Sequence, residues 1–448
     1  MKKWFSTVLI MALVVTMFTG FSYADQSEFS LELRDTDFVE GQLIFSVEAD
    51  ASFSLASTGD VTMQATTLKD KGFAIVDSLL AEGDDFSVQA FSNDFQAEVI
   101  KNMGLVYLVE YSEKDYKSIE EAKKYLTNVL QDLGYKVRYV SENYVMQAFD
   151  ARPAVDRASQ ITKEITTEEI EMEMHNNQRW HYEMIKAPQA WNITQGSSAV
   201  KIAVLDTGID HNHGSLRNFV NTSLGRSFVG GTTMDVRGHG THVAGTIASY
   251  GSVSGVMKNA TLIPVKVLGD DGRGSLYGIQ QGVLHASSIG SDVINMSLGG
   301  GGYNQGMDEA CRTAVARGSI VIAATGNEYR GSISYPAAYS SVIAVGSVTA
   351  NRTRSDFSNY GTGLELMAPG SNIYSTFPNN RFYTDSGTSM ATPHVAGIAG
   401  LMRSVNRNIS VNDVRTILRN TAHHAGNFNE YGYGIVDAYA AVQAARAK

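Results

Sequence analysis

The 448-residue sequence has one cysteine, seven prolines and three tryptophans. A single cysteine excludes an intrachain disulfide, so core packing must hold the folded chain together. This residue, Cys311, lies in "MDEACRTAVARG", a pattern typical of an amphipathic helix, and we expect it to be a small buried side chain rather than a nucleophile. Dense runs of lysine and arginine with interleaved aromatics are also missing, which argues against nucleic-acid binding.

Long apolar runs are missing beyond the first residues of the chain, so no membrane anchor is expected. The chain begins with Lys2 and Lys3, continues through an apolar stretch over 8–18, and reaches "FSYAD". In that segment Ser22 and Ala24 occupy the positions that a signal peptidase reads. These features predict a signal peptide over 1–24 and a secreted, extracellular protein, which we expect to be a monomer.

Charge is distributed unevenly along the rest of the chain. Residues 25–175 contain 30 acidic and 13 basic residues, a net charge of −17, whereas residues 176–448 contain 16 acidic and 21 basic residues, a net charge of +5. The contrast predicts two parts, of which the acidic one can associate with the mildly basic one. Between them, residues 150–176 are dominated by charge and predict a linker that is open to proteolysis.

Residues 25–149 predict a small α+β domain. "GQLIFSV" and "LVYLVEY" are typical of strands, and "VRYVSENYVMQAF" of a final pair of strands. "SIEEAKKYLTNVLQDLG" predicts a helix capped by Ser118, with Glu121 three residues later. We expect a compact sheet with its helices on one face.

Residues 177–448 predict an α/β domain. Continuously apolar runs such as "VKIAVLD", "TLIPVKVL", "SIVIAATGN" and "SVIAVGSV" alternate with helical stretches. Strands of this kind are buried on both faces, so we expect a largely parallel sheet with helices on both sides. Functional residues in such folds gather at the ends of strands.

Four polar residues stand at such positions: Asp206, His239, Asn327 and Ser389. Each has a simpler interpretation, because Asp206 and Asn327 could form turns and Ser389 could cap a helix. Together they match the needs of acyl transfer: a hydroxyl nucleophile, an imidazole base, a carboxylate that orients the imidazole, and donors for the oxyanion. Their separations of 33 and 150 residues, from Asp206 to His239 and from there to Ser389, mean that only folding could assemble them.

Five segments in one order carry a resemblance: "AVLDTGID", "GHGTHVAG", "VINMSLGG", "AATGNE" and "GTSMATPHVAG". They resemble the signature segments of the subtilisin-like serine proteases, a resemblance that covers about 178–445. It implies that Asp206, His239 and Ser389 form the catalytic triad. It also implies that Asn327 and the backbone N–H of Ser389 form the oxyanion hole, beside Thr388. His242 and His394 are expected to be structural.

The resemblance also implies a cleft in which an extended peptide adds as a strand. One edge would be Ser297, Leu298, Gly299 and Gly300, and the other Gly272, Arg273 and Gly274. Small, mostly neutral residues would line the first specificity pocket, which favours a large apolar or aromatic substrate side chain, with Glu328 at the rim able to accept lysine. The implied lining is Ser297, Leu298, Gly299, Ala324, Thr325, Gly326 and Ser334.

No cofactor is expected for catalysis. Where the family commonly places a calcium-binding aspartate, this chain has Ser215, so the tight calcium site is expected to be absent. Glu365, near Ala337 and Tyr339, is a weak candidate for a cation ligand. The short segment "NEYRGSISY" resembles the trimmed loop of high-alkaline subtilisins, which implies alkaline activity.

Residues 25–149 resemble the inhibitor-type prodomains of secreted subtilisins, with Phe149 where the chain would occupy the active site. At 125 residues this segment is longer than the compact subtilisin version, and self-cleavage could follow Phe149 or fall within 150–176. The leading hypothesis is therefore a secreted endopeptidase made as a zymogen. An inactive peptide-binding relative should have lost a catalytic residue, and an esterase should carry Gly-x-Ser-x-Gly; neither feature is present.

Overall fold

A computed structural model describes residues 37–49, 66–80, 92–149 and 174–448. All of them belong to one unit, Arg34–Lys448. The predicted signal peptide and nearly all of the predicted linker lie outside the described residues. Within the described ranges, no helix combines the length and apolar character that crossing a membrane requires.

The centre of the fold is a seven-stranded sheet in which every neighbouring pair is parallel. Apart from β6 and the first residues of β5 and β7, nearly every residue of these strands is buried, because most of the side chains on both faces are apolar. The α/β prediction is thus confirmed. In spatial order the strands are β13 (Leu366–Pro369), β12 (Ile343–Val348), β11 (Ile320–Ala324), β9 (Val293–Met296), β5 (Gly196–Asp206), β7 (Asn259–Lys266) and β6 (Arg226–Ser227).

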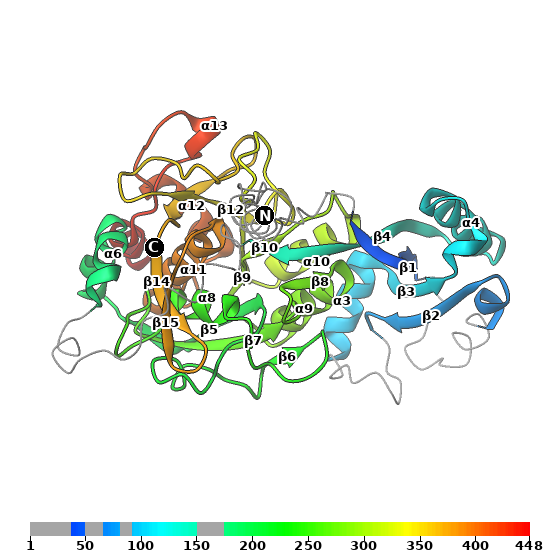
Figure 1. The fold of residues 1–448 in the computed structure, drawn as a ribbon, viewed down its shortest axis with the longest axis horizontal. Coiled ribbons are helices and arrows are strands. Elements are labelled where there is room, and N and C mark those ends of the chain that lie inside the picture. The colour runs from blue at the N-terminus through cyan, green and yellow to red at the C-terminus, as the bar shows by residue number, and fades with distance from the viewer. Residues whose placement is uncertain (1–36, 50–65, 81–91, 150–173) are drawn as a thin grey trace, which may run out of the picture. The chain divides into compact units, whose positions relative to one another are not determined.

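Helices cover both faces of this sheet (Figure 1). One core cluster joins one face to α8 (His239–Ile247), α11 (Thr388–Val405), α12 (Val411–Thr421) and α14 (Ala438–Ala447). A second cluster joins the other face to α9 (Leu276–Ser288) and α10 (Gln305–Ala316), where Cys311 is fully buried as expected. The smaller elements are η2 (Glu113–Asp115), η5 (Asn176–Gln178), α6 (Arg179–Met184), α7 (Ala187–Trp191), the hairpin β14 (Ile373–Phe377) and β15 (Arg381–Asp385), and α13 (Phe428–Tyr431).

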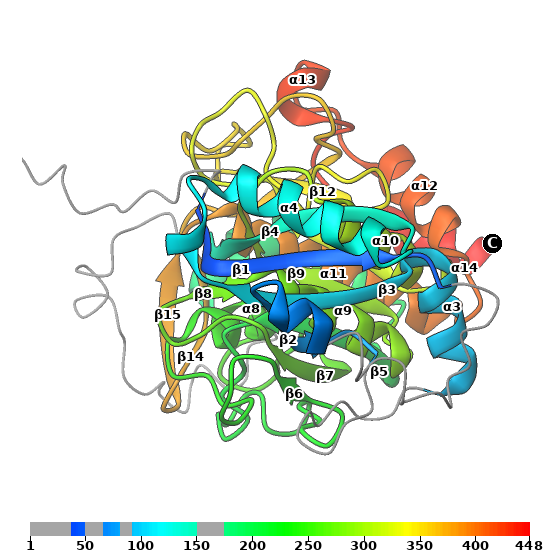
Figure 2. The same cartoon turned by 90° about the vertical axis from the view of Figure 1, so that its right-hand side faces the viewer.

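The N-terminal part forms an antiparallel sheet (Figure 2) in the order β4 (Val137–Ala148), β1 (Phe38–Val47), β3 (Leu105–Tyr111) and β2 (Phe73–Ser78). Helix α4 (Ile119–Asp132) packs on one face, where Leu126 lies in the same cluster as Phe45. Ser118 accepts a hydrogen bond from the Glu121 N–H, as its predicted capping role requires.

Two details of this sheet correct the sequence predictions. The segment "VRYVSENYVMQAF" is one continuous strand, β4, rather than a pair. Helix α3 (Asn93–Met103) lies on the face opposite α4, so the helices are not on one face. The reason is that β1 is apolar on both faces: Phe45 packs toward α4, whereas the neighbouring Ile44 belongs to the cluster that contains α3, α9 and α10.

Candidate active site

The end of β4 leaves its own sheet and pairs antiparallel with two short strands, β8 (Arg273–Ser275) and β10 (Leu298–Gly299). In this register Met146 faces Gly274, and Ala148 faces Leu298. The Ala148 N–H also donates to the carbonyl oxygen of Gly272 at 3.0 Å. The two strands predicted to hold an extended peptide therefore hold a strand of this same chain.

Asp206 and His239 meet where β5 ends and α8 begins. The His239 Nδ1 lies 2.7 Å from the Asp206 Oδ1, and both side chains are fully buried. The N–H of Thr207 donates to the same carboxylate oxygen at 2.7 Å. Gly240 permits this approach, because a Cβ there would overlap the carbonyl oxygen of Gly208. An imidazole held in this way donates from Nδ1 and keeps Nε2 as the atom that can accept a proton.

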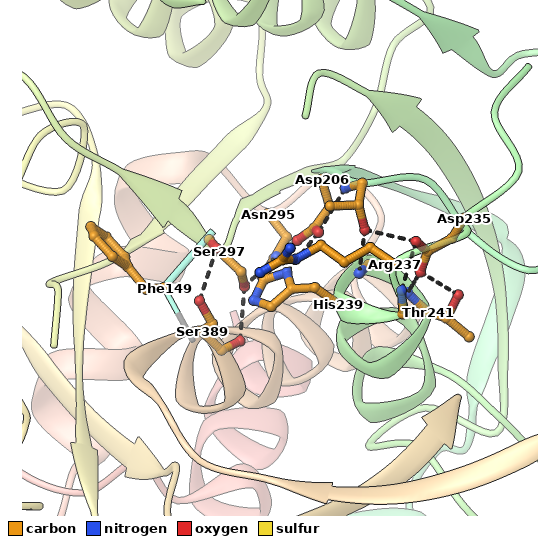
Figure 3. Close-up of polar contacts among 12 residues, drawn as sticks. Phe149, Asp206, Asp235, Arg237, His239, Thr241, Asn295, Ser297 and Ser389 are labelled. Atoms are coloured by element: carbon orange, nitrogen blue, oxygen red, sulfur yellow. Dashed lines mark hydrogen bonds and ion pairs between the residues drawn. The ribbon is translucent and has the colours of Figure 1, made fainter. Parts of the chain in front are cut away.

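Ser389 is buried in the first turn of α11 (Figure 3). The residue at the N-cap is Gly387, so the simpler interpretation, in which Ser389 caps the helix, is wrong. Its hydroxyl donates to the carbonyl oxygen of Ser297 at 2.8 Å, and the Ser297 hydroxyl donates back to the Ser389 carbonyl at 2.9 Å. In Figure 3 the serine lies between Phe149 on one side and His239 on the other.

Asn327 follows β11 and is held by the start of α11. Its Oδ1 accepts from both the N–H and the hydroxyl of Thr388, each at 2.9 Å. Those two donors identify the carboxamide oxygen, so Nδ2 is the end that points the other way. Nδ2 donates to the carbonyl oxygen of Phe149 at 2.8 Å. The carbonyl oxygen of Phe149 thus accepts the hydrogen bond that an oxyanion would accept from this carboxamide.

Phe149 is 4% exposed, and its ring lies against Gly299, one of the residues of the predicted pocket. A Cβ on Gly299 would overlap this ring, and one on Gly387 would crowd the Phe149 carbonyl oxygen. Both glycines are therefore places where the backbone must approach the bound residue closely.

The remaining predicted pocket residues lie next to one another around the end of β11. Ala324 and Thr325 are fully buried, and the Ser334 N–H donates to the Thr325 carbonyl at 2.9 Å. A Cβ on Gly326 would overlap the Asn359 carboxamide and crowd the Ser334 hydroxyl. Thr325, Gly326 and Ser334 are therefore neighbours in the fold, and their role as the lining of a specificity pocket stays a prediction.

Asn359 is a residue that sequence reasoning missed. Its Nδ2 donates to the Thr325 carbonyl at 3.0 Å and to the Glu328 carboxylate at 2.6 Å. Its Oδ1 accepts from the N–H groups of Glu328 and Arg330. Glu328, expected at the rim of the pocket, is therefore hydrogen-bonded to Asn359. Sequence reasoning missed this pair because the two residues are 31 positions apart in the chain.

Asp235 is a second such residue, four positions before His239. Its Oδ1 accepts from the Thr207 hydroxyl and the Gly238 N–H, both at 2.9 Å, and its Oδ2 accepts from the N–H and hydroxyl of Thr241 at 2.8 and 2.6 Å. Burial raises the pKa of this carboxyl group. Asp235 thus connects Thr207, the residue after Asp206, to Gly238 and Thr241 on the two sides of His239 (Figure 3). In the sequence, the only sign of this role is a carboxylate three residues before the "GHGTH" segment.

Glu365 is not placed to hold a cation. Both of its carboxylate oxygens accept hydrogen bonds from the Arg415 guanidinium, and Oε1 also accepts from Arg419 Nε at 2.7 Å. The weak cation site predicted at Glu365 is thus corrected: arginine side chains supply the positive charge. Ser215 is buried. Across the described ranges, no three His, Cys, Asp or Glu side chains converge on one point.

Two other histidines near the site are structural. His242 Nε2 lies 3.0 Å from the Ile373 carbonyl oxygen. His394 is buried in α11, with Nδ1 2.8 Å from the Met390 carbonyl and Nε2 2.9 Å from Nδ1 of His181. Burial lowers the pKa of His394 to about 4, which keeps this ring neutral at physiological pH.

Comparison with known proteins finds one matching family model and many similar proteases. The model of the subtilase family of peptidases matches residues 197–434. M-protease of Shouchella clausii is 46% identical over 269 residues, which span 59% of this chain and 70% of the relative. Subtilisin BL of Lederbergia lenta is 46% identical over 59% of this chain and 98% of its own length. An alkaline protease of Alkalihalobacillus alcalophilus is 43% identical over 303 residues, 66% of this chain and 77% of the relative.

Proposed function

Because this chain belongs to the subtilase family and is a serine endopeptidase, we propose that Ser389, His239 and Asp206 are its triad and that it is secreted as a self-processing zymogen. The observation that carries this proposal is the 2.8 Å hydrogen bond from Asn327 Nδ2 to the Phe149 carbonyl oxygen. It lies at the end of a strand held in the cleft, as a cleaved peptide would be held.

In the proposed reaction, Ser389 Oγ attacks the carbonyl carbon of the scissile bond while its proton passes to Nε2 of His239. Asp206 stabilises the resulting imidazolium through Nδ1. The charge that develops on the substrate oxygen is stabilised by Asn327 Nδ2 and the Ser389 N–H, at the positive end of α11. His239 then protonates the leaving amine, and water hydrolyses the acyl-enzyme. To start this sequence the Ser389 hydroxyl must leave its hydrogen bond to Ser297.

Sequence preference is proposed to be broad, because β8 and β10 contact the bound strand by backbone pairing. The residue before the scissile bond is the exception, since its side chain enters the pocket. Phe149 lies against Gly299 there, which supports a preference for large apolar or aromatic side chains.

Residues 25–149 are proposed to act as the inhibitor of the catalytic domain, and self-cleavage is proposed to follow Phe149. Their sheet places β4 in the cleft, so the enzyme cannot bind a second peptide until that strand leaves. Alkaline activity, a monomeric state and the absence of a tight calcium site remain part of the proposal.

The test is hydrolysis of an unstructured protein by the purified chain and by its Ser389→Ala variant. We expect the variant to be inactive, and to remain a single uncut polypeptide on a denaturing gel. Ser198→Ala, at an exposed position away from the cleft, is the matched control and should process and cleave like the parent. If the Ser389→Ala variant cleaved as fast as the parent, the mechanism would be wrong.

A further inference from the structure

The connection between β2 and β3 is much longer than these strands require. They are adjacent and antiparallel, and two residues are enough to join such a pair. Here residues 79–104 intervene, and they include the 11-residue helix α3. Since α3 is not needed to connect the strands, its surroundings indicate what it contributes.

The apolar face of α3 is buried with helix α10 of the catalytic domain. Phe95, Val99 and Met103 are at most 1% exposed and share a core cluster with Ala310 and Ala314 of α10. Figures 1 and 2 place α3 beside the catalytic helices, on the side of the N-terminal sheet away from α4. This helix therefore packs as a contact between the two parts of the chain.

Polar contacts fix the position of α3 along α10. Glu98 Oε2 lies 2.7 Å from Nη1 of Arg317, with each side chain about one-third exposed. The Arg317 guanidinium also lies over the Phe95 ring, 4.6 Å from its centroid. One turn along, Asn102 Nδ2 donates to the Thr313 hydroxyl at 3.2 Å.

A residue of β4 joins the same interface. Arg138 Nη2 donates to the Asn102 carbonyl oxygen at 3.0 Å and to Glu309 Oε1 of α10 at 2.6 Å. These contacts involve none of the cleft residues that hold Phe149. The N-terminal segment is therefore attached at two separate places: β4 in the cleft and α3 on α10.

We propose that the outer face of α10, ending at Arg317, is a docking site for α3 that retains the N-terminal segment after the chain is cut, and so sets how long the enzyme stays inhibited. This inference rests on the proposed inhibitory role of residues 25–149. Cleavage after Phe149 removes the covalent link but leaves every α3–α10 contact in place. Release then requires both attachments to open, and α3 makes it slower than the cleft alone would.

The experiment uses the full chain with Ser389→Ala and with the recognition sequence of a site-specific protease inserted between residues 150 and 173. After cutting by that added protease, the rate at which the N-terminal fragment dissociates is measured by size-exclusion chromatography upon dilution. Glu98→Arg places two cations together, and we expect dissociation about tenfold faster. The exchange Glu98→Arg with Arg317→Glu restores opposite charges and should return the rate to within about threefold of the parent.

Asp94→Arg is the matched control, because it makes the same charge change at an exposed position of α3 and should leave the rate unchanged. Asn102→Ala, which removes the hydrogen bond to Thr313, should speed release about threefold and provides a milder variant if Glu98→Arg folds poorly. Thermal unfolding of each uncut chain checks folding. Parent-like dissociation of Glu98→Arg and Asn102→Ala, or no recovery in the exchange variant, would overturn the inference. Because these chains carry no Ser389, failure here is distinct from failure of the proposed catalysis.

Discussion

The carbonyl oxygen of Phe149 accepts a 2.8 Å hydrogen bond from the side chain of Asn327, 178 residues further along the chain. Asn327 is itself held by two donors from Thr388, so the carboxamide is oriented before any substrate arrives. Preorganised donors of this kind stabilise developing charge without having to rearrange during the reaction. In the proposed function, the strand that ends in Phe149 takes the place of a substrate, and the N-terminal segment would compete with substrates for the cleft.

Removing the carboxamide tests this arrangement. Asn327→Ala should lower kcat on a short peptide substrate about 10²- to 10³-fold with little change in KM, because the donor acts mainly on the charge of the transition state. Steady-state kinetics of the processed enzyme measure both constants. Asn351→Ala, at an exposed position, is the control and should match the parent. A loss of kcat below threefold for Asn327→Ala would refute the oxyanion role.

Closing the pocket should change specificity. Since a Cβ on Gly299 would overlap the Phe149 ring, Gly299→Val leaves room only for a small side chain. We expect kcat/KM to fall at least about 100-fold for a peptide with phenylalanine before the scissile bond, and much less for one with alanine. The ratio of the two kcat/KM values in parent and variant is the measurement. An unchanged ratio would mean that the ring pocket lies elsewhere.

Asp235 is expected to position the triad. Asp235→Asn replaces a carboxylate that accepts four hydrogen bonds with a group whose nitrogen must face donors. Each hydrogen bond to a charged group contributes about 1.5–3 kcal/mol. Losing such bonds should let the end of β5 and the start of α8 shift, so that Asp206 and His239 are held less firmly and kcat falls about tenfold or more. Thr241→Val, which removes one of these bonds, should have a smaller effect of the same kind. If Asp235→Asn changed only the unfolding midpoint and not kcat, its role would be stability alone.

Stability should fall in mild acid because of His394. Its pKa in the fold is about 4 rather than the ordinary 6.5, so below pH 6.5 the unfolded chain binds a proton that the folded chain does not. The free energy of unfolding should therefore decrease as pH falls from about 6.5 to 4, by roughly 3 kcal/mol for this group. Denaturant unfolding of the Ser389→Ala chain measures it. His394→Gln should flatten the slope, whereas His424→Gln, at an exposed position, should not.

The contacts of Glu365 lead to two expectations, one for the addition of a chelator and one for the substitution Glu365→Gln. A chelator should leave the unfolding temperature of the Ser389→Ala chain unchanged, because arginines occupy the carboxylate that was the weak cation candidate. Glu365→Gln should cost about 2 kcal/mol, since it leaves two partly buried guanidinium groups without their anion. A sharp drop in unfolding temperature upon chelation would show that cation sites outside this cluster matter.

The sequence predicted the fold class and the family correctly because both are encoded in short local segments. The short run "VKIAVLD" is mostly apolar and rich in β-branched residues, which favours a buried strand, and it forms the second half of β5. Asp206, His239 and Ser389 could be chosen because their neighbouring glycines and hydroxyls form short, specific segments. The α/β class and the family were both confirmed on that basis.

Other features depended on contacts between residues far apart in the chain. Periodicity could show that α3 or β4 was amphipathic, but not which face of the sheet α3 would cover or that β4 would continue into the cleft. Glu365 looked like a cation ligand until packing placed Arg415 and Arg419 on its carboxylate. Local sequence thus determined most of the helices and strands and pointed to the candidate reactive groups. Only tertiary packing decided which groups these elements and side chains contact. The physical reason is that a charged side chain can pair with any opposite charge, and an apolar face can pack on any apolar surface, that the fold places next to it.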